Sequence, residues 1–233
     1  MAVYAISDLH LSFGTDKPMD IFGVNWENHA ERLRENWVKT VRDEDYVLIS
    51  GDISWGINLE EADADLAFID SLPGEKILSK GNHDYWWSTL HKFNQHFASK
   101  GYRTLKILHN NAYRIGDYTV CGSRGWSSPD EEGFDDEDRK IFNREMDRLR
   151  FSLTEGRKLG GEIIAMLHYP PFDGRHHPNE FASVLKEFCV GTCIYGHIHG
   201  NADESWKNET IDDIRYHLTS CNIIGFTPVK LRE

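Results

Sequence analysis

The sequence has no apolar run long enough to cross a membrane. Its first apolar stretch, residues 3–6, has the length of a strand, whereas a membrane-spanning helix needs roughly 20 apolar residues. No basic segment followed by an apolar one marks a secretory signal near residue 1. We therefore expect a cytoplasmic protein without membrane association.

The sequence is also poor in cysteine. Its four cysteines, which include no C-x-x-C pair, are Cys121, Cys189, Cys193 and Cys221. All four lie in apolar surroundings, which favours reduced thiols in the core over disulfides or a zinc knuckle. This cysteine usage is typical of a reducing compartment.

Positive charge is scarce. The chain of 233 residues has 26 Lys and Arg against 38 Asp and Glu, so its formal net charge is −12. Broad electrostatic capture of nucleic acid needs a basic surface, and we therefore expect no nucleic-acid partner. The charge does not exclude a small anionic substrate held by a local metal ion. The 12 histidines are many for this length, and their positions are informative.

The spacing of apolar residues predicts an α/β protein. Hydrophobic residues make up 39% of the chain, which is enough for a sizeable core. Short apolar runs, and a hairpin over residues 106–123 that turns at Gly116-Asp117, predict the strands: residues 3–7, 46–50, 75–80, 162–167, 192–195, 214–219 and 221–225. Apolar residues at helical spacing predict the helices: residues 30–41, 58–72 and 136–155.

The segments between these elements contain no domain boundary. The acidic stretch over residues 127–138 is typical of a surface loop, and Gly156 is expected to end the helix that follows it. No internal repeat, low-complexity tract or Pro- and Ser-rich linker divides the chain. We therefore expect one domain over residues 1–233.

Five of the predicted strands end in polar residues that bind metals or move protons. In α/β sheets the loops at the carboxyl ends of strands converge on one crevice, and binding sites form there. Each residue taken alone has a simpler explanation, such as a helix cap, a left-handed turn or a buried imidazole. Their joint occurrence predicts one site. The motifs are Asp8-Leu9-His10, Gly51-Asp52, Gly81-Asn82-His83-Asp84, His168 and Gly196-His197-Ile198-His199.

Most of the polar side chains in these motifs are oxygen and nitrogen donors to metals. Two carboxylates, one amide and four imidazoles, with no thiolate, suit Mn, Fe, Zn or Ni rather than a structural zinc site. In D-x-H and H-x-H the two side chains would face the same way if the segments were extended. Seven ligands are too many for one ion with an open position. We therefore expect two metal ions that share a carboxylate, as in two-metal hydrolases.

In this order, D-x-H, G-D, G-N-H-D, a lone His and G-H-x-H resemble the motifs of the calcineurin-like metallophosphoesterases. The resemblance covers residues 3–200 and includes all five blocks. It implies a four-layer α/β/β/α sandwich, in which two mixed β-sheets pack face to face with helices outside. It also implies a metal-dependent phosphohydrolase of the bacterial type.

The resemblance further implies a role for each motif residue. The metal ligands would form two sets: Asp8, His10 and His199 in one, and Asn82, His168 and His197 in the other. Asp52 would bridge the two metals. His83 would not be a ligand but would face the phosphate and the leaving-group oxygen. Asp84 would orient His83, as carboxylates orient catalytic imidazoles.

Two metals and one acid imply a mechanism. A metal-bridging water loses its proton near neutral pH, and the hydroxide attacks phosphorus in line with the ester oxygen. The metals and His83 stabilise charge on the phosphoryl oxygens, and His83 protonates the departing alkoxide. The expected substrate is a small phosphomonoester or phosphodiester, and manganese is one candidate metal.

The motifs leave several alternatives open. A nuclease or a protein phosphatase would share the fold and the site, although the acidic charge counts against a nuclease. A non-catalytic metal-binding scaffold would normally have lost ligands, and none is missing here. Arg124 either meets the phosphate or pairs with the acidic loop. The loop residues Arg175, His176 and His177 either contact the substrate or are solvated, and solvation is favoured. The motifs do not indicate an oligomeric state. An exposed cluster among four tryptophans would mark an interface: Trp26, Trp55, Trp86 and Trp87.

Overall fold

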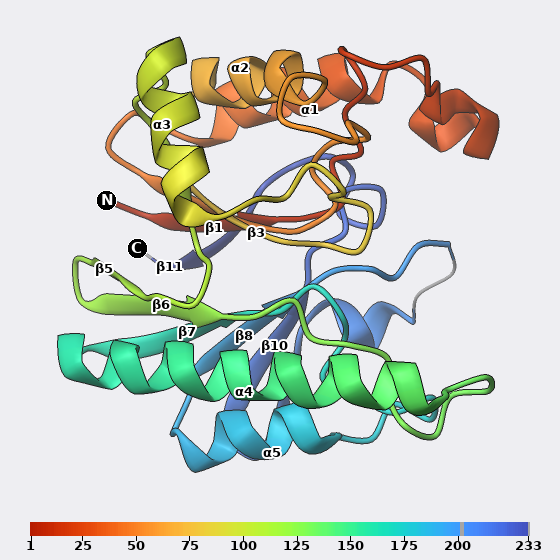
Figure 1. The fold of residues 1–233 in the computed structure, drawn as a ribbon, viewed down its shortest axis with the longest axis vertical. Coiled ribbons are helices and arrows are strands. Elements are labelled where there is room, and N and C mark those ends of the chain that lie inside the picture. Colours follow the sequence, from red (N-terminus) through yellow and green to blue (C-terminus); the bar gives the residue numbers. More distant parts are fainter. Residues whose placement is uncertain (201–202, 233) are drawn as a thin grey trace.

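Two β-sheets pack face to face, and helices cover the outer face of each sheet (Figure 1). The computed structural model describes residues 1–200 and 203–232. Both sheets are mixed, because each combines parallel neighbours with antiparallel strands at an edge. The four-layer α/β/β/α sandwich implied by the sequence is therefore confirmed.

The first sheet has five strands in the order β11-β1-β2-β3-β4. Strands β1 to β4 are parallel to one another, whereas β11 pairs antiparallel with β1. The strand bounds are Val3–Ile6 (β1), Tyr46–Ser50 (β2), Glu75–Ser79 (β3), Leu105–Ile107 (β4) and Val229–Arg232 (β11). Three helices cover this sheet: His29–Thr40 (α1), Asp63–Ser71 (α2) and Leu90–Lys100 (α3) (Figure 1). Two short 3-10 helices precede α1: Met19–Phe22 (η1) and Val24–Trp26 (η2).

The second sheet has six strands in the order β5-β6-β7-β8-β10-β9. Its middle strands are parallel, and β5 and β9 close its edges as antiparallel neighbours. The strand bounds are Tyr113–Ile115 (β5), Tyr118–Gly122 (β6), Glu162–Met166 (β7), Thr192–Tyr195 (β8), Glu209–Ile211 (β9) and Ile214–Leu218 (β10). Asp136–Leu159 (α4) and Glu180–Glu187 (α5) lie on its outer face, and Glu204–Lys207 (η3) precedes β9 (Figure 1).

The central strands bury both faces, as their continuous apolar runs predict. In β1, Val3 and Ala5 join the apolar layer between the two sheets. Tyr4 and Ile6 alternate with them and pack into the separate apolar layer beneath the helices of the first sheet. This period of two is the alternation that a strand imposes on successive side chains.

The two sheets are joined at their carboxyl edges. The main-chain NH of Ser7, just past β1, donates to the carbonyl oxygen of Thr219, just past β10, at 2.9 Å. The NH of Cys221 donates back to the carbonyl oxygen of Ser7 at 3.0 Å. The loops that follow strands of both sheets therefore meet at one place.

Several elements differ from the sequence prediction. The segment predicted as a strand at residues 221–225 is a turn, closed by the NH of Phe226 donating to the carbonyl oxygen of Cys221 at 2.7 Å. The chain then returns to the first sheet as β11. Helices α3 and α5 were not predicted, and α4 extends to Leu159 rather than ending before Gly156. Helix α4 begins at Asp136, as predicted. Asp135 fixes this start, because its side chain accepts hydrogen bonds from the NH groups of Glu137 and Asp138.

Gly156 lies inside α4, where the helix packs closely on β6. A Cβ atom built on Gly156 would overlap the Sγ atom of Cys121. The sequence suggested a helix stop, but the structure shows a glycine that permits close approach of helix and sheet.

The cysteines are all free thiols, as predicted. Three of them are buried, as predicted. The fourth, Cys189, is exposed, so the prediction that it lies in the core is wrong. None of the helices in the described part of the chain is long and apolar enough to span a membrane.

Replacing Gly156 by alanine should destabilise the fold. The clash with Cys121 should cost about 1–3 kcal/mol, which exceeds the gain of up to about 1 kcal/mol from better helix propensity. We expect Tm to fall by several degrees in thermal denaturation followed by circular dichroism. Asp147→Ala, at an exposed position of the same helix, is the control and should leave Tm nearly unchanged. A Gly156→Ala variant as stable as the parent would show that the helix can move away from β6 without cost.

Candidate metal centre

The polar motifs follow strands of both sheets and meet at the joined carboxyl edges. Asp8 and His10 follow β1, Asp52 follows β2, and residues 81–84 follow β3, all in the first sheet. The second sheet contributes the residues that follow β7 and β8: His168, His197 and His199. The structure therefore brings the predicted site residues into one cluster.

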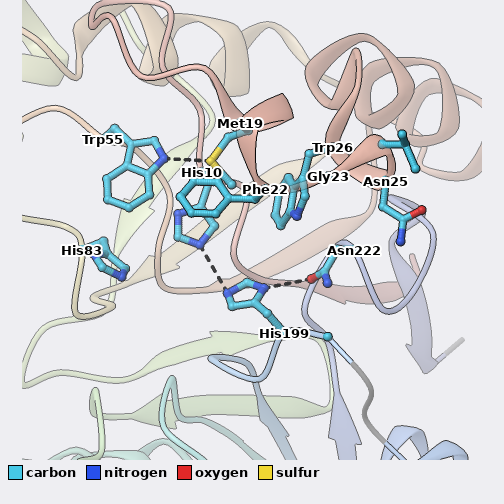
Figure 2. Close-up of a pocket in the computed structure, with 12 residues that line it drawn as sticks. His10, Met19, Phe22, Gly23, Asn25, Trp26, Trp55, His83, His199 and Asn222 are labelled. Carbon is cyan, nitrogen blue, oxygen red and sulfur yellow. Dashed lines mark hydrogen bonds between the residues drawn. The ribbon is translucent and has the colours of Figure 1, made fainter.

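The first group of donors is Asp8, His10 and His199. One ligand atom from each of these residues lies within 4.8 Å of the others. The Nε2 atom of His199 lies 3.5 Å from Oδ1 of Asp8 and 3.4 Å from Nε2 of His10. Figure 2 shows the imidazoles of His10 and His199 pointing toward one another.

The second group surrounds Asn82. Its Oδ1 atom lies 2.7 Å from Nε2 of His168 and 3.0 Å from Nδ1 of His197. Asp52 lies between the two groups, because its Oδ2 atom is 3.4 Å from Nε2 of His168 and 3.8 Å from Nε2 of His10. Asp8 also lies near both donor groups, since ligand atoms of Asp8, Asp52 and His168 lie within 4.8 Å of one another.

Neighbouring groups orient two of the imidazoles. Nδ1 of His168 lies 3.0 Å from the carbonyl oxygen of Ser50, where an Nδ1–H donates. Nδ1 of His199 lies 3.0 Å from Oδ1 of Asn222 in the same way (Figure 2). Both contacts direct the Nε2 lone pair toward the cluster, as outer partners of metal-binding histidines do. Asn222 was not identified from the sequence, because it stands in no motif and lies in the segment mistaken for a strand.

The loops at the site are left-handed rather than extended. Asp8, His10, Asp52 and His197 have φ values of 58°, 46°, 51° and 70°. The extended D-x-H and H-x-H geometry expected from the sequence is therefore wrong. Such conformations cost about 1–3 kcal/mol each and persist where the surroundings fix them. Here the NH of His10 donates to the carbonyl oxygen of Asp52 at 3.0 Å, and the NH of His197 donates to the Asp8 carboxylate at 3.1 Å.

The electrostatics of the cluster favour cations. Burial lowers the pKa of His10 and of His197 to about 3 and that of His168 to about 4, although the Asp8 charge opposes this, so these imidazoles are neutral at pH 7. Neutral imidazole is the form that binds a metal. Burial, together with the Asp84 and Asp8 carboxylates, raises the pKa of Asp52 to about 9. Although burial opposes it, the Asp8 carboxylate raises the pKa of the fourth imidazole, His199. Buried carboxylates, imidazoles and one amide oxygen fit divalent cations bound by nitrogen and oxygen.

The family resemblance implied that Asp84 orients His83. In the structure, the Asp84 carboxylate makes no hydrogen bond to the His83 imidazole. Its fully buried carboxylate accepts hydrogen bonds from the main-chain NH groups of residues 52, 53, 54 and 81, and from the indole of Trp86. With these five donors its acceptor capacity is committed. Asp84 instead ties the turn after β3 to the turn after β2. Gly81 allows this contact, because a Cβ there would overlap the carboxylate of Asp52.

His83 lies beside the first donor group. Its main-chain NH donates to Oδ1 of Asp52 at 2.8 Å. Its ring centroid is 4.6 Å from that of Trp55 and 5.7 Å from that of His10. Burial lowers the pKa of His83, and the charge of Asp84 partly offsets this effect. The imidazole lines an open cavity, where it can meet a ligand (Figure 2).

The basic side chains considered from the sequence contact none of the metal donors in the described part of the structure. Arg124 stacks on Trp126 at 4.3 Å and lies 3.7 Å from the buried carboxylate of Glu145. Its carbonyl oxygen accepts the NH of His168 at 3.0 Å, so Arg124 supports the main chain of a donor residue. Arg175 is exposed in its loop.

The other aromatic and histidine side chains are accounted for by packing. His176 stacks between Phe172 and Trp206 with ring centroids 4.3 Å apart on each side, whereas His177 is exposed. None of the four tryptophans considered from the sequence is exposed: Trp26 and Trp86 are buried, and Trp55 and Trp87 are half-buried. They do not form the exposed patch that would mark an interface.

The sandwich and the cluster at its edge define a metal-dependent hydrolase. The model of the calcineurin-like phosphoesterases matches residues 1–201. The chain belongs to this family and is a metal-dependent phosphoesterase.

One relative is similar in sequence, and solved structures share the fold. An uncharacterised protein of Methanocaldococcus jannaschii is 26% identical over 160 residues, covering 64% of this chain and 84% of that protein. The phosphopantetheinyl hydrolase of Mycobacterium tuberculosis is 12% identical with a TM-score of 0.57, and the match covers 94% of this chain and 88% of the other. A protein of unknown function from Aquifex aeolicus is 17% identical with a TM-score of 0.51, over 98% and 95% of the two chains.

The role found for Asp84 predicts the effect of an isosteric change. Asp84→Asn replaces an acceptor oxygen by an NH₂ group that faces main-chain donors, so it should lower the free energy of unfolding by about 3 kcal/mol. Urea denaturation measures this loss. Asp16→Asn, at an exposed position, should leave the stability unchanged. Unaltered stability in Asp84→Asn would mean that the two turns are held by other contacts.

Proposed function

We propose that this chain hydrolyses small phosphomonoesters or phosphodiesters with the help of two transition-metal ions. The observation that carries the proposal is the pair of donor groups that meet at Asp8 and Asp52, with His83 beside them. One group has a carboxylate and two imidazoles, and the other has an amide oxygen and two imidazoles. Two such groups around shared carboxylates are the arrangement that two-metal hydrolases use.

The proposal assigns each residue one role. Asp8, His10 and His199 hold one metal ion, and Asn82, His168 and His197 hold the other. Asp52 bridges the two, which agrees with its contact to one imidazole of each group. When bound, the two ions supply Lewis acidity toward the phosphoryl oxygens and a nucleophile at neutral pH. The donor set suits Mn, Fe, Zn or Ni, and manganese is the ion we would supply first.

His83 is proposed as the general acid. Its imidazole lies beside the first donor group without belonging to either, and its main chain is anchored to Asp52. From this position it can donate a proton to the leaving-group oxygen and a hydrogen bond to the phosphoryl oxygens. Asp84 acts on this residue indirectly, by fixing the turn that carries it.

A small substrate is favoured over a macromolecular one. The net charge of −12 opposes binding of nucleic acid, so a nuclease is the weaker alternative. A protein phosphatase of the same fold is an alternative that no feature favours. A non-catalytic scaffold is disfavoured because all seven donors and His83 are present. We propose a cytoplasmic location, which the free thiols support.

His83→Ala should separate chemistry from metal binding. We expect the variant to lose roughly 100- to 10,000-fold in kcat, because it lacks a general acid, while it keeps its metal. Activity assays and elemental analysis of the same preparation measure the two effects.

Two further variants act as controls for His83→Ala. His91→Ala, at an exposed position of α3, should change neither kcat nor metal content. Asp52→Ala should lose both, because its carboxylate contacts both donor groups. A His83→Ala protein without metal would contradict the proposed division of roles.

Metal removal should abolish activity reversibly. Chelation should end hydrolysis of bis(4-nitrophenyl) phosphate and of 4-nitrophenyl phosphate, and re-addition of Mn, Ni or Zn should restore it, because the proposed nucleophile would be supplied by the metal ions. Absorbance of nitrophenolate follows both reactions, and the preferred ester narrows the substrate class. Activity that persists after verified metal removal would refute the proposed function.

A further inference from the structure

A cavity of about 650 Å³ opens beside the first donor group. His10, His83 and His199 form the wall next to the proposed metal centre, and the segment that includes η1 and η2 forms the opposite wall (Figure 2). Its size lies in the range of small-molecule sites, which span roughly 300–1,000 Å³. The proposed hydrolysis of the phosphoester bond does not require a cavity this large.

Apart from Asn25, the side chains on the wall opposite the histidines are apolar. Met19, Phe22, Trp26 and Trp55 line the cavity, and Figure 2 shows their side chains grouped around His10. The Trp55 indole NH donates to the Met19 sulfur at 3.1 Å, so this donor is already used. Among the described residues that line the cavity there is no Asp, Glu, Lys or Arg. These walls suit a large apolar group rather than a sugar.

Apolar side chains also stand exposed at this wall. Phe22 and Val24 line the cavity while 64% and 77% exposed, respectively. Large apolar side chains at such exposure beside a cavity are typical of ligand-binding surfaces, because a bound apolar group removes them from water. Ile21, within η1 and next to Phe22 in the chain, is 72% exposed but does not line the cavity.

The position of His83 indicates which part of the substrate enters the cavity. A general acid must lie within hydrogen-bond reach of the leaving-group oxygen. Since His83 lines the cavity, the group attached to that oxygen extends into it.

We propose that the cavity binds the leaving alcohol of the substrate and that this alcohol carries a large apolar group, either an aryl ring system or an alkyl chain. This inference rests on the proposed function and deepens it, because it assigns a substrate class to the phosphoesterase. The apolar side chains of Met19, Phe22, Val24, Trp26 and Trp55 then determine specificity, while the donor groups hold the phosphate.

The test compares leaving groups of different size and nearly equal acidity. For the ester type that the enzyme prefers, kcat/KM is measured for phenyl against 2-naphthyl esters and for ethyl against octyl esters. We expect the larger member of at least one pair to be favoured by about tenfold or more. A preference within the aryl pair indicates a flat ring system, and one within the alkyl pair indicates a chain.

Variants at the wall connect this preference to the cavity. Phe22→Ala and Val24→Asn, both at exposed positions, should reduce the preference about fivefold, whereas Ile21→Ala should retain it. Equal kcat/KM for small and large leaving groups, or a preference unaffected by both variants, would overturn the inference while leaving the phosphoesterase intact. Absence of hydrolysis of every ester by metal-loaded protein would instead refute the proposed function.

Discussion

The structure depends on the junction between the carboxyl edges of its two sheets. The main chain of Ser7 exchanges hydrogen bonds with Thr219 and Cys221, so the end of β1 is fixed against the end of β10. This junction places loops of the first sheet, which carry all the carboxylates of the site, against loops of the second sheet, which carry three of its imidazoles. Neither sheet alone holds a complete donor group, because Asp8 needs His199 and Asn82 needs His168 and His197.

Main-chain hydrogen bonds account for the energetics of the site. Buried carboxylates and left-handed residues are both unfavourable, and they persist because main-chain hydrogen bonds fix the loops. Asp84 contributes most visibly, since its carboxylate gathers main-chain donors from two neighbouring turns. Besides burial, the repulsion among Asp8, Asp52 and Asp84 raises the pKa of Asp52, and bound cations would offset this repulsion. The fold therefore provides an edge lined with oxygen and nitrogen donors, and the segment before α1 adds an apolar wall beside it.

The sequence predicts this site better than it predicts the elements around it. Asp8, Asp52, Asn82 and the histidines were found because each follows a short apolar run, and parallel strands bring such positions together. Asp84 was found too, but its partners are main-chain NH groups that no side-chain pattern indicates.

What the sequence could not give depends on contacts between distant residues. Asn222 is a ligand partner only because the turn at 221–226 brings it beside His199, and β11 is a strand only because β1 offers an edge. Gly156 has the sequence context of a helix stop, and only its contact with Cys121 explains it. The apolar cavity likewise joins residues 19–26 to Trp55 and His83, which share no spacing pattern.

The central claim is that one chain holds two metal ions around Asp8 and Asp52. Native mass spectrometry of the protein loaded with Mn²⁺ counts the ions on each chain directly and does not depend on finding a substrate. The account predicts a mass increment of two ions per chain, reduced in Asp52→Asn because that carboxylate contacts both groups. A single ion per chain, or a count of two that Asp52→Asn leaves unchanged, would contradict it.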